Sequence, residues 1–164
     1  MRLAVISDTH LSVPDDRFER IYALHLQDAD ALVHCGDMTG AALYHSLCRH
    51  PRLIAVRGNC DHFLLDHDLP STLSAELALP SGHVLRLGLA HGWGERGSVW
   101  QRVAELFPGH DLVCFGHTHR RHWAEHEGAH LLNPGSLYEG SLALVDVDED
   151  GGLACRFVDV DDET

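Results

Sequence analysis

The sequence predicts an α/β fold arranged in layers, and three observations support this prediction. Short continuous apolar runs in the first half of the chain, such as Leu3 to Ile6, are typical of strands covered on both faces. Segments with apolar residues at helical spacing follow the first two of these runs. In the second half, apolar and polar residues alternate over several stretches, which favours half-exposed strands and a more antiparallel arrangement.

Three strands and two helices are expected in the first third of the chain. Asp15 should cap a helix whose apolar residues run from Phe18 to Leu26. Thr39 should cap a helix whose apolar residues run from Leu43 to Cys48. Both helices should lie on a sheet whose strands are predicted at residues 3–6, 31–35 and 53–56.

One further helix and a series of short strands are expected after residue 70. Ser98 and Gln101 form a capping-box pattern ahead of apolar residues that continue to Phe107. Turn signals at residues 133–135 and 150–152 separate the last strands. The strands themselves are predicted at residues 73–79, 84–90, 112–115, 122–125, 129–132, 141–147 and 153–160.

The length and composition predict a single domain over residues 1–164, with no cap domain because no length is spare for a lid. The chain has 164 residues, of which 45% are hydrophobic, so it can bury a core without disulfides. Its five scattered cysteines favour reduced thiols. No signal-peptide pattern and no run of eighteen apolar residues is present, so we expect a cytoplasmic protein with no membrane partner.

The charge balance argues against long nucleic acid as a partner. The formal net charge is −13, and all 12 cationic side chains are arginines. Such a surface repels polyanions unless a local feature reverses the field. The acids between Asp146 and Glu163 are expected to form a solvated edge and tail.

Potential metal ligands follow five of the predicted strands within a residue or two. The carboxyl ends of neighbouring strands share one edge of an α/β sheet, so loops far apart in sequence can meet there. We therefore expect one site formed by seven side chains: Asp8 with His10, Asp37, Asn59, His91, and His117 with His119.

The types of these ligands indicate the ions that they would hold. Two carboxylates, one amide oxygen and four imidazoles suit Mn²⁺, Fe²⁺, Co²⁺, Ni²⁺ or Zn²⁺ better than Ca²⁺. Seven ligands are more than one catalytic ion uses, so we expect two divalent ions that share a bridging carboxylate, with Mn²⁺ favoured. Even with a bridging hydroxide, such a site would attract a phosphate ester on this acidic protein.

The ordered motifs resemble the signature of the calcineurin-like metallophosphoesterases over nearly the whole chain. These motifs are Asp8-x-His10, Gly36-Asp37, Gly58-Asn59-x-Asp61, His91-Gly92 and Gly116-His117-x-His119. The loops at residues 57–61 and 133–136 are similar to those of the small single-domain, YfcE-like phosphodiesterase branch.

The resemblance implies a four-layer αββα sandwich of two mixed β-sheets with helices outside. It also implies that Asp8, His10 and His119 hold one ion, that Asn59, His91 and His117 hold the other, and that Asp37 bridges them. The implied function is that of a phosphodiesterase, in which a hydroxide bridging the two ions attacks a small phosphodiester.

Several residues are expected to act on the substrate itself. Asp37, Asn59, Asp61 and His91 are the expected catalytic residues, and Asn59, Arg57 and His10 are expected to contact the phosphate. Many relatives carry histidine at the position of Cys60, and a buried thiol donates a proton to an alkoxide poorly. His62 or His10 could take that role, while Cys60 is better explained as a structural thiol than as a nucleophile.

Other functions remain open for the same residues. A phosphomonoesterase or protein phosphatase could use the same metals, and the retromer scaffold subunit shows that this fold can serve as a non-catalytic binding platform. A scaffold should have lost ligands, whereas this chain keeps all seven, which favours catalysis. An exposed edge that includes Trp93, Trp100 or Trp123 could support a homo-oligomer, although each could equally be part of the core.

Overall fold

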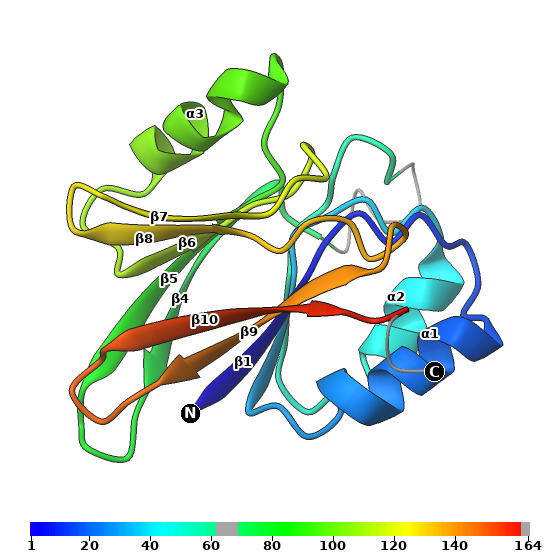
Figure 1. Ribbon diagram of the computed structural model, residues 1–164, viewed down its shortest axis with the longest axis horizontal. Helices are drawn as coiled ribbons and strands as arrows, with labels where there is room; N and C mark the ends of the chain where they lie inside the picture. Colours follow the sequence, from blue (N-terminus) through cyan, green and yellow to red (C-terminus); the bar gives the residue numbers. More distant parts are fainter. Residues whose placement is uncertain (62–68, 162–164) are drawn as a thin grey trace.

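Two five-stranded β-sheets pack face to face, with helices on their outer faces (Figure 1). The computed structural model describes residues 1–61 and 69–161. The first sheet has the order β10-β9-β1-β2-β3, with bounds Leu153–Asp159, Ser141–Val147, Arg2–Ile6, Ala31–His34 and Leu53–Ala55. The second has the order β4-β5-β6-β8-β7, with bounds Thr72–Ala78, Val84–Ala90, Leu112–Cys114, Ala129–Asn133 and His122–His126.

Both sheets are mixed, which confirms the predicted four-layer αββα sandwich. In the first sheet, β1, β2 and β3 are parallel, while β9 and β10 are antiparallel to their neighbours. In the second sheet, β5, β6 and β8 are parallel, and β4 and β7 form antiparallel edges. The expectation of a more antiparallel second half is therefore only partly correct, because a helix between β5 and β6 makes a parallel crossover there.

The helices cover the two outer faces. Helix α1 (Asp16–Ile21), which continues as the π-helical turn η1 (Tyr22–Leu26), and helix α2 (Ala41–Leu47) lie on the first sheet. The 3-10 turn η2 (Arg96–Ser98) leads into α3 (Val99–Leu106), which lies on the second sheet (Figure 1). No helix in the described part of the chain is long and apolar enough to cross a membrane.

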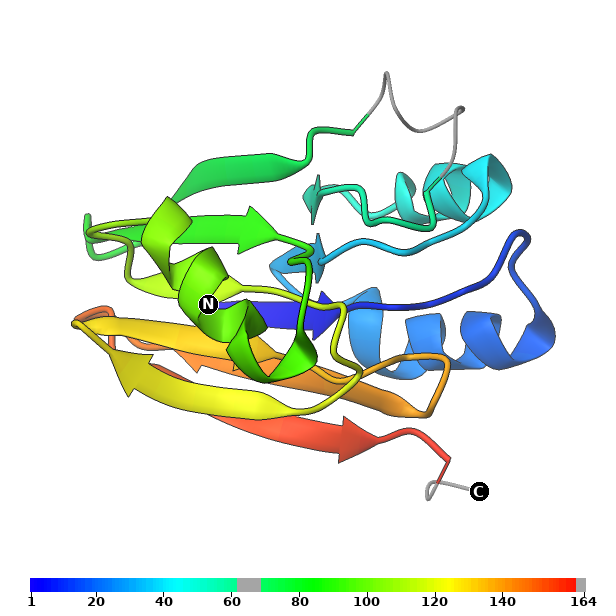
Figure 2. The same cartoon turned by 90° about the horizontal axis from the view of Figure 1, so that it is seen from above.

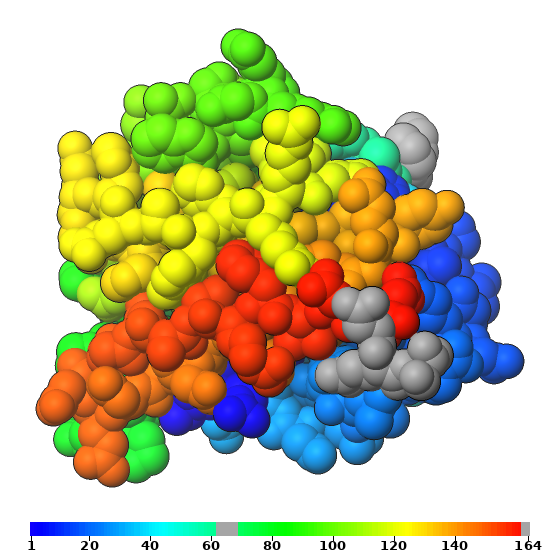
Figure 3. Space-filling view, viewed as in Figure 1, coloured from blue at the N-terminus to red at the C-terminus, as the bar shows by residue number. Residues whose placement is uncertain are grey.

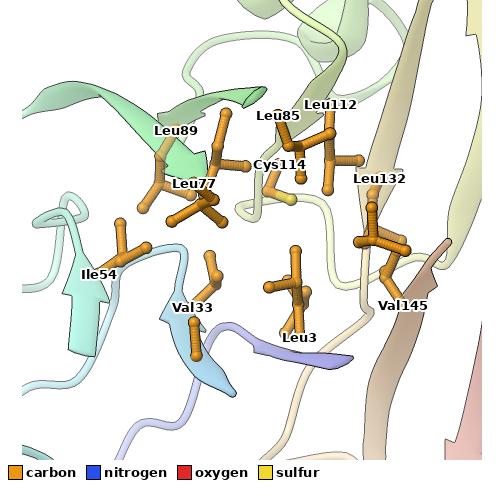
Figure 4. Packing of buried hydrophobic residues seen from close by; sticks show 14 of the residues in the cluster. Leu3, Val33, Ile54, Leu77, Leu85, Leu89, Leu112, Cys114, Leu132 and Val145 are labelled. Carbon is orange, nitrogen blue, oxygen red and sulfur yellow. The ribbon is translucent and has the colours of Figure 1, made fainter. Parts of the chain in front are cut away.

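Alternating residues of the central strands separate the cores. In β1, Leu3 and Val5 point into the core between the sheets, whereas Ala4 and Ile6 pack under the helices. Figure 4 shows Leu3 facing residues of the second sheet such as Leu85 and Leu132. Burial on both faces explains why the first strands are continuous apolar runs.

One of the three predicted helix caps is confirmed. The side chain of Asp15 accepts a 2.7 Å hydrogen bond from the backbone N–H of Phe18. Helix α2 instead has Gly40 as its N-cap residue, and Thr39 lies one residue earlier, where its backbone N–H donates to Asp61 at 2.8 Å. Ser98 is the N-cap residue of α3, as predicted, but its side chain makes no capping hydrogen bond; its hydroxyl instead accepts a 2.8 Å bond from Arg102.

The two sheets are joined along one face by contacts between β10 and the β7–β8 hairpin. Figure 3 shows the C-terminal strands, in red and orange, next to this hairpin, in yellow. Arg121, which directly precedes β7, donates hydrogen bonds to Asp159 of β10 and to Ser141 of β9. The loop after β6 is thereby fixed against the end of the first sheet.

Candidate metal centre

The five predicted ligand loops meet at one site, because the strands before them run in one direction. In Figure 2, β1 (blue) and β5 (green) both point toward the side where the loops gather. Strands β1, β2 and β3 are parallel in one sheet, and β5 and β6 are parallel in the other. All seven predicted ligands therefore follow strands that end at this edge.

Three of the ligands form one group around an oxygen of Asp8. Oδ1 of Asp8 lies 3.2 Å from Nε2 of His119 and 4.0 Å from Nε2 of His10. The two imidazole nitrogens are 3.4 Å apart. This is the group expected to hold the first ion, an assignment that stays a prediction.

Three other ligands gather around the side-chain oxygen of Asn59. Oδ1 of Asn59 lies 3.0 Å from Nδ1 of His117 and 3.2 Å from Nε2 of His91. Asp37 lies between the two groups, since its Oδ2 is 3.4 Å from Nε2 of His91 and 4.0 Å from Nε2 of His10. The position of Asp37 suits the bridging role that the sequence predicts for it.

The oxygen and nitrogen atoms that could bind metal face one another, with no described arginine side chain between them. This arrangement is expected of ligands that surround bound cations. Nδ1 of His91 donates to the carbonyl oxygen of Cys35 at 2.8 Å, so the lone pair on Nε2 faces Asn59 and Asp37. Oδ1 of Asp8 is fully buried and makes no hydrogen bond in the described structure. A buried carboxylate oxygen without a partner is costly, and a divalent ion would satisfy it.

The other oxygen of Asp8 and the remaining imidazole nitrogens are held by neighbouring groups. Oδ2 of Asp8 accepts hydrogen bonds from the hydroxyl of Ser7 at 2.6 Å and from the backbone N–H of His117 at 3.1 Å. His119 donates through Nδ1 to Glu139 at 2.9 Å, and His117 donates through Nε2 to the carbonyl of Gly94 at 3.4 Å. Each ring therefore presents its other nitrogen to the site, as metal-binding histidines generally do.

The backbone at the ligands has an unusual conformation. Within residues 1–61 and 69–161, seven non-glycine residues have positive φ, and five of these are predicted ligands. The five are Asp8, His10, Asp37, His117 and His119, with φ between 48° and 68°. Such backbone strain persists only where the surrounding structure enforces it, and it concentrates at functional sites.

Burial and charge shift two of the pKa values at the centre. Burial alone would raise the pKa of Asp37, but His91 and the backbone N–H of Cys60 outweigh it and hold the pKa well below its usual range. Burial lowers the pKa of His91, but the neighbouring Asp37 and Asp8 raise it above the usual value. Both shifts have the same cause, which is the attraction between the His91 ring and the carboxylates beside it.

Asp61, which the sequence predicts to be catalytic, joins the loops and does not face the site. Its Oδ1 accepts from the backbone N–H groups of Met38 and Thr39 at 2.7 and 2.8 Å. Its Oδ2 accepts from those of Gly58 and Asp37 at 2.7 and 2.9 Å. With four N–H groups bound, the carboxylate acts by positioning Asp37 and the loop that carries Asn59.

Cys60 lies at the rim of the centre as a protonated thiol. Its sulfur is close enough to His10 and Asp37 to form a candidate ligand group with them. Burial, together with Asp37, raises the pKa of the Cys60 thiol to about 11. His62, the alternative proton donor from the sequence, lies outside the described residues, while Arg57 lines a cleft beside Asn59 and His91.

Two glycines permit the close approach of the ligand loops. A Cβ atom on Gly58 would lie 2.1 Å from Oδ1 of Asp37, and one on Gly116 would lie 2.0 Å from Oγ of Ser7. Both contacts are far shorter than van der Waals distance, so no other residue fits without moving the site. These requirements explain the glycines in Gly58-Asn59 and Gly116-His117.

Several supporting residues were not identified from the sequence. Asn133 donates to the carbonyl of Gly116 at 2.8 Å, and Ser136 donates to the carbonyl of Asp8 at 2.9 Å. His34 is fully buried. Its Nε2 forms a hydrogen bond with the hydroxyl of Thr9, and its Nδ1 accepts one from the backbone N–H of Gly36. Only the Asn133-Pro134-Gly135-Ser136 turn gave a sequence signal, and that signal did not reveal its contacts.

Comparisons with known proteins show which family the chain resembles. The family model of the calcineurin-like phosphoesterase superfamily domain matches residues 1–150. The chain is 31% identical to "Probable metallophosphoesterase YsnB" of Bacillus subtilis (strain 168), over 84% of this chain and 75% of that protein. It is 24% identical to "Phosphodiesterase MJ0936" of Methanocaldococcus jannaschii, over 82% of this chain and 83% of that protein.

A solved structure shares the fold. The crystal structure of Vps29 from Chaetomium thermophilum superposes with a TM-score of 0.70 at 23% sequence identity. The superposition covers 96% of this chain and 95% of that one. At this level of identity the match shows a common architecture and nothing finer.

Proposed function

The chain belongs to the calcineurin-like phosphoesterase superfamily, and from this premise we propose that it is a phosphodiesterase that hydrolyses small phosphodiesters with two divalent metal ions. Mn²⁺ is the favoured ion, and Ni²⁺, Fe²⁺, Co²⁺ and Zn²⁺ are alternatives that suit the same oxygen and nitrogen donors. The proposal includes one metallophosphoesterase domain without a cap. It places the enzyme in the cytoplasm, in keeping with five free cysteines.

One observation carries the proposal: the buried Oδ1 of Asp8 and the lone pairs of His119, His91 and Asn59 all face the same centre. The sharpest case is the separation of 3.2 Å between Oδ1 of Asp8 and Nε2 of His119, without a hydrogen bond on that oxygen. Groups that each accept a proton or a metal ion repel one another at this distance unless a proton or a metal ion lies between them. A structural histidine cluster would instead pair donors with acceptors.

Bound divalent ions would supply an activated water near neutral pH and positive charge for the phosphoryl oxygens. The chain itself orients the ligands through Glu139, Cys35 and Asp61, which fix rings and loops before substrate binds. His10 and His119 have side chains that are 25% and 24% exposed, so a small ester can reach the centre from solvent. Asn59 and Arg57 are proposed to contact the phosphate.

Cys60 and Asp61 are poorly suited to donate a proton to the leaving group. Cys60 keeps its proton because its pKa is raised to about 11, and the carboxylate of Asp61 is already bound by four N–H groups. Neither is a strong acid at neutral pH. His10 and His62 therefore stay the proposed candidates for this proton.

Two other functions fit parts of these observations. A phosphomonoesterase or protein phosphatase would use the same centre but would prefer a dianionic monoester. A non-catalytic scaffold is favoured only by the shared fold with Vps29. The complete set of ligands argues against the scaffold, because a binding platform has no need to hold five ligand residues in strained backbone conformations.

The deciding experiment compares turnover of bis(p-nitrophenyl) phosphate and p-nitrophenyl phosphate, with Mn²⁺ and after chelation. We expect faster turnover of the diester and its loss on chelation. Asp37→Ala and His91→Ala should each lower kcat at least about 100-fold. His45→Ala, at an exposed histidine of α2, is the matched control and should keep full activity.

The outcomes separate the three functions. Faster release from the monoester would establish the phosphatase alternative. If the folded chain binds two metal ions and still turns over neither ester with any ion, the scaffold function would be the one supported. Full activity in Asp37→Ala would contradict the assignment of the centre itself.

A further inference from the structure

A cleft of about 320 Å³ opens beside the metal centre and is continuous with it. Two predicted metal ligands, Asn59 and His91, form part of its lining, so a phosphate held at the centre would place one ester group at the mouth of this cleft. Most of the exposed lining is apolar. Its lining also includes Arg57, Thr72, Trp93 and Leu106.

Trp93 is the largest apolar side chain of the cleft, and 48% of it is exposed. Its backbone is nevertheless held in place. Nε of Arg102 in α3 donates to the carbonyl of Trp93 at 3.0 Å, and Nη2 donates to the carbonyl of Glu95 at 2.8 Å. An exposed indole on a fixed loop can bind a ring at little entropic cost.

The same loop also contacts the metal centre. The carbonyl of Gly94, next to Trp93, accepts a hydrogen bond from Nε2 of His117 at 3.4 Å. The position of the indole is therefore coupled to that of a predicted ligand by a single residue. Leu24, another exposed apolar side chain, lies in the helical segment η1 on the first sheet.

Charge distinguishes this cleft from a second one on the opposite side of the centre. The second cleft, of about 380 Å³, is lined by Thr9 and Tyr138, by the carboxylates of Asp15 and Asp161, and by Arg17, which pairs with Asp161 and leaves one carboxylate in excess. Among the residues that the structure describes, the lining of the Trp93 cleft contains no carboxylate. An anionic ester is repelled less on the Trp93 side.

We propose that the Trp93 cleft binds an aromatic ester group of the substrate, an aryl ring or a nucleobase stacked on the indole, while the phosphate occupies the metal centre. This inference rests on the proposed function and narrows its substrate class to phosphodiesters with an aromatic group. The apolar lining and the indole provide the ring contact, and Thr72 provides a hydroxyl for polar substituents at its edge.

Isothermal titration calorimetry with the Mn²⁺-loaded protein tests the inference without any need for turnover. The probes are methylphosphonate and phenylphosphonate, which carry the same anionic group and differ in the ring. We expect phenylphosphonate to bind about three- to tenfold more tightly. In Trp93→Ala this ratio should fall to about one, with the Kd of methylphosphonate changed less than about twofold, and Trp93→Phe should restore most of the ratio.

Tyr138→Ala is the matched control, because Tyr138 is an aromatic residue with 62% exposure in the second cleft. It should leave the ratio unchanged. A ratio near one in the unmodified protein, or its loss in Tyr138→Ala and not in Trp93→Ala, would overturn the inference. Equal weakening of both phosphonates in Trp93→Ala would also overturn it, since that result indicates a structural role.

The outcomes also separate this inference from the proposed function. Preference for the phenyl probe in a protein that turns over no ester would support the cleft and overturn the hydrolase. Turnover of diesters with no preference for the phenyl probe would support the hydrolase and overturn the aromatic cleft. Failure of both phosphonates to bind the metal-loaded protein would overturn the inference as well.

Discussion

Glu139 accepts a 2.9 Å hydrogen bond from Nδ1 of His119, and this bond turns Nε2 of the same ring toward Oδ1 of Asp8, 3.2 Å away. The carboxylate thus fixes both the tautomer and the orientation of a predicted ligand. Glu139 lies in the turn before β9, whereas His119 lies in the loop after β6. The pair joins the two sheets at the metal centre.

Glu139→Gln is expected to weaken metal binding without unfolding the protein. The amide can still accept a hydrogen bond but carries no charge, so the ring becomes a poorer ligand. We expect about a tenfold loss in Mn²⁺ affinity, the lower end for such partners because the side chain of Glu139 is 58% exposed. Isothermal titration calorimetry with Mn²⁺ measures this affinity.

The control for this change is Glu105→Gln, at an exposed position of α3. It removes the same charge from the protein at a distance from the centre. Equal affinities in the two variants would show that Glu139 acts only through net charge.

Asp61→Asn is expected to destabilise the fold and disturb the metal centre together. The amide nitrogen cannot accept the bonds that one carboxylate oxygen now receives from two backbone N–H groups. We expect a loss of about 2–4 kcal/mol in the free energy of unfolding, measured in urea. Asp16→Asn, in the exposed first turn of α1, should cost under about 1 kcal/mol.

Unchanged stability in Asp61→Asn would contradict the positioning role. In that case a loss of turnover alone would return Asp61 to the set of catalytic residues.

Gly116→Ala is expected to be far more damaging than the same change at Gly97. The added methyl at Gly116 would lie 2.0 Å from Oγ of Ser7 and 2.8 Å from Oδ2 of Asp8, whereas at Gly97 nothing lies within 4 Å. Gly116→Ala should cost at least about 2 kcal/mol in unfolding free energy and should lower metal affinity. Similar unfolding curves for both variants would show that the loop moves aside freely.

His34 makes a prediction about pH. Its side chain is fully buried, and burial lowers its pKa to about 4, below the ordinary value of 6.5. The unfolded chain therefore binds a proton at this residue before the folded chain does, so the stability that neutral His34 contributes is present above pH 6.5 and is lost as the pH falls toward 4. Bound metal ions would only strengthen this preference for the neutral ring.

The measurement compares the metal-free protein with His34→Gln in urea at pH 7.5 and pH 4.5. The variant loses packing and hydrogen bonds at both values but has no ring to titrate. We expect its deficit in unfolding free energy to shrink by about 2 kcal/mol at the lower pH. A deficit that does not depend on pH would mean that His34 titrates normally in the folded protein.

Short-range patterns were sufficient to predict the strands and the seven candidate ligands that the fold brings to one edge. Each ligand follows an apolar run within a few residues, as Asp8 follows β1 and His117 follows β6. Burial on both faces makes these runs visible in the sequence, and parallel strands necessarily bring their carboxyl ends to one edge. The Asp15 cap was predictable for the same reason, since its partner Phe18 is three residues away.

The tertiary structure decided what long-range contacts control. Helix α2 begins one residue later than predicted, and the backbone N–H of Thr39 binds Asp61, 22 residues away. The roles of Glu139 and Trp93 likewise depend on loops from different parts of the second half of the chain. The sequence by itself determined which groups are able to bind metal, because that depends on residue type and on position after a strand. Only the folded chain determined how those groups are oriented, because hydrogen bonds between distant loops set the directions of their lone pairs.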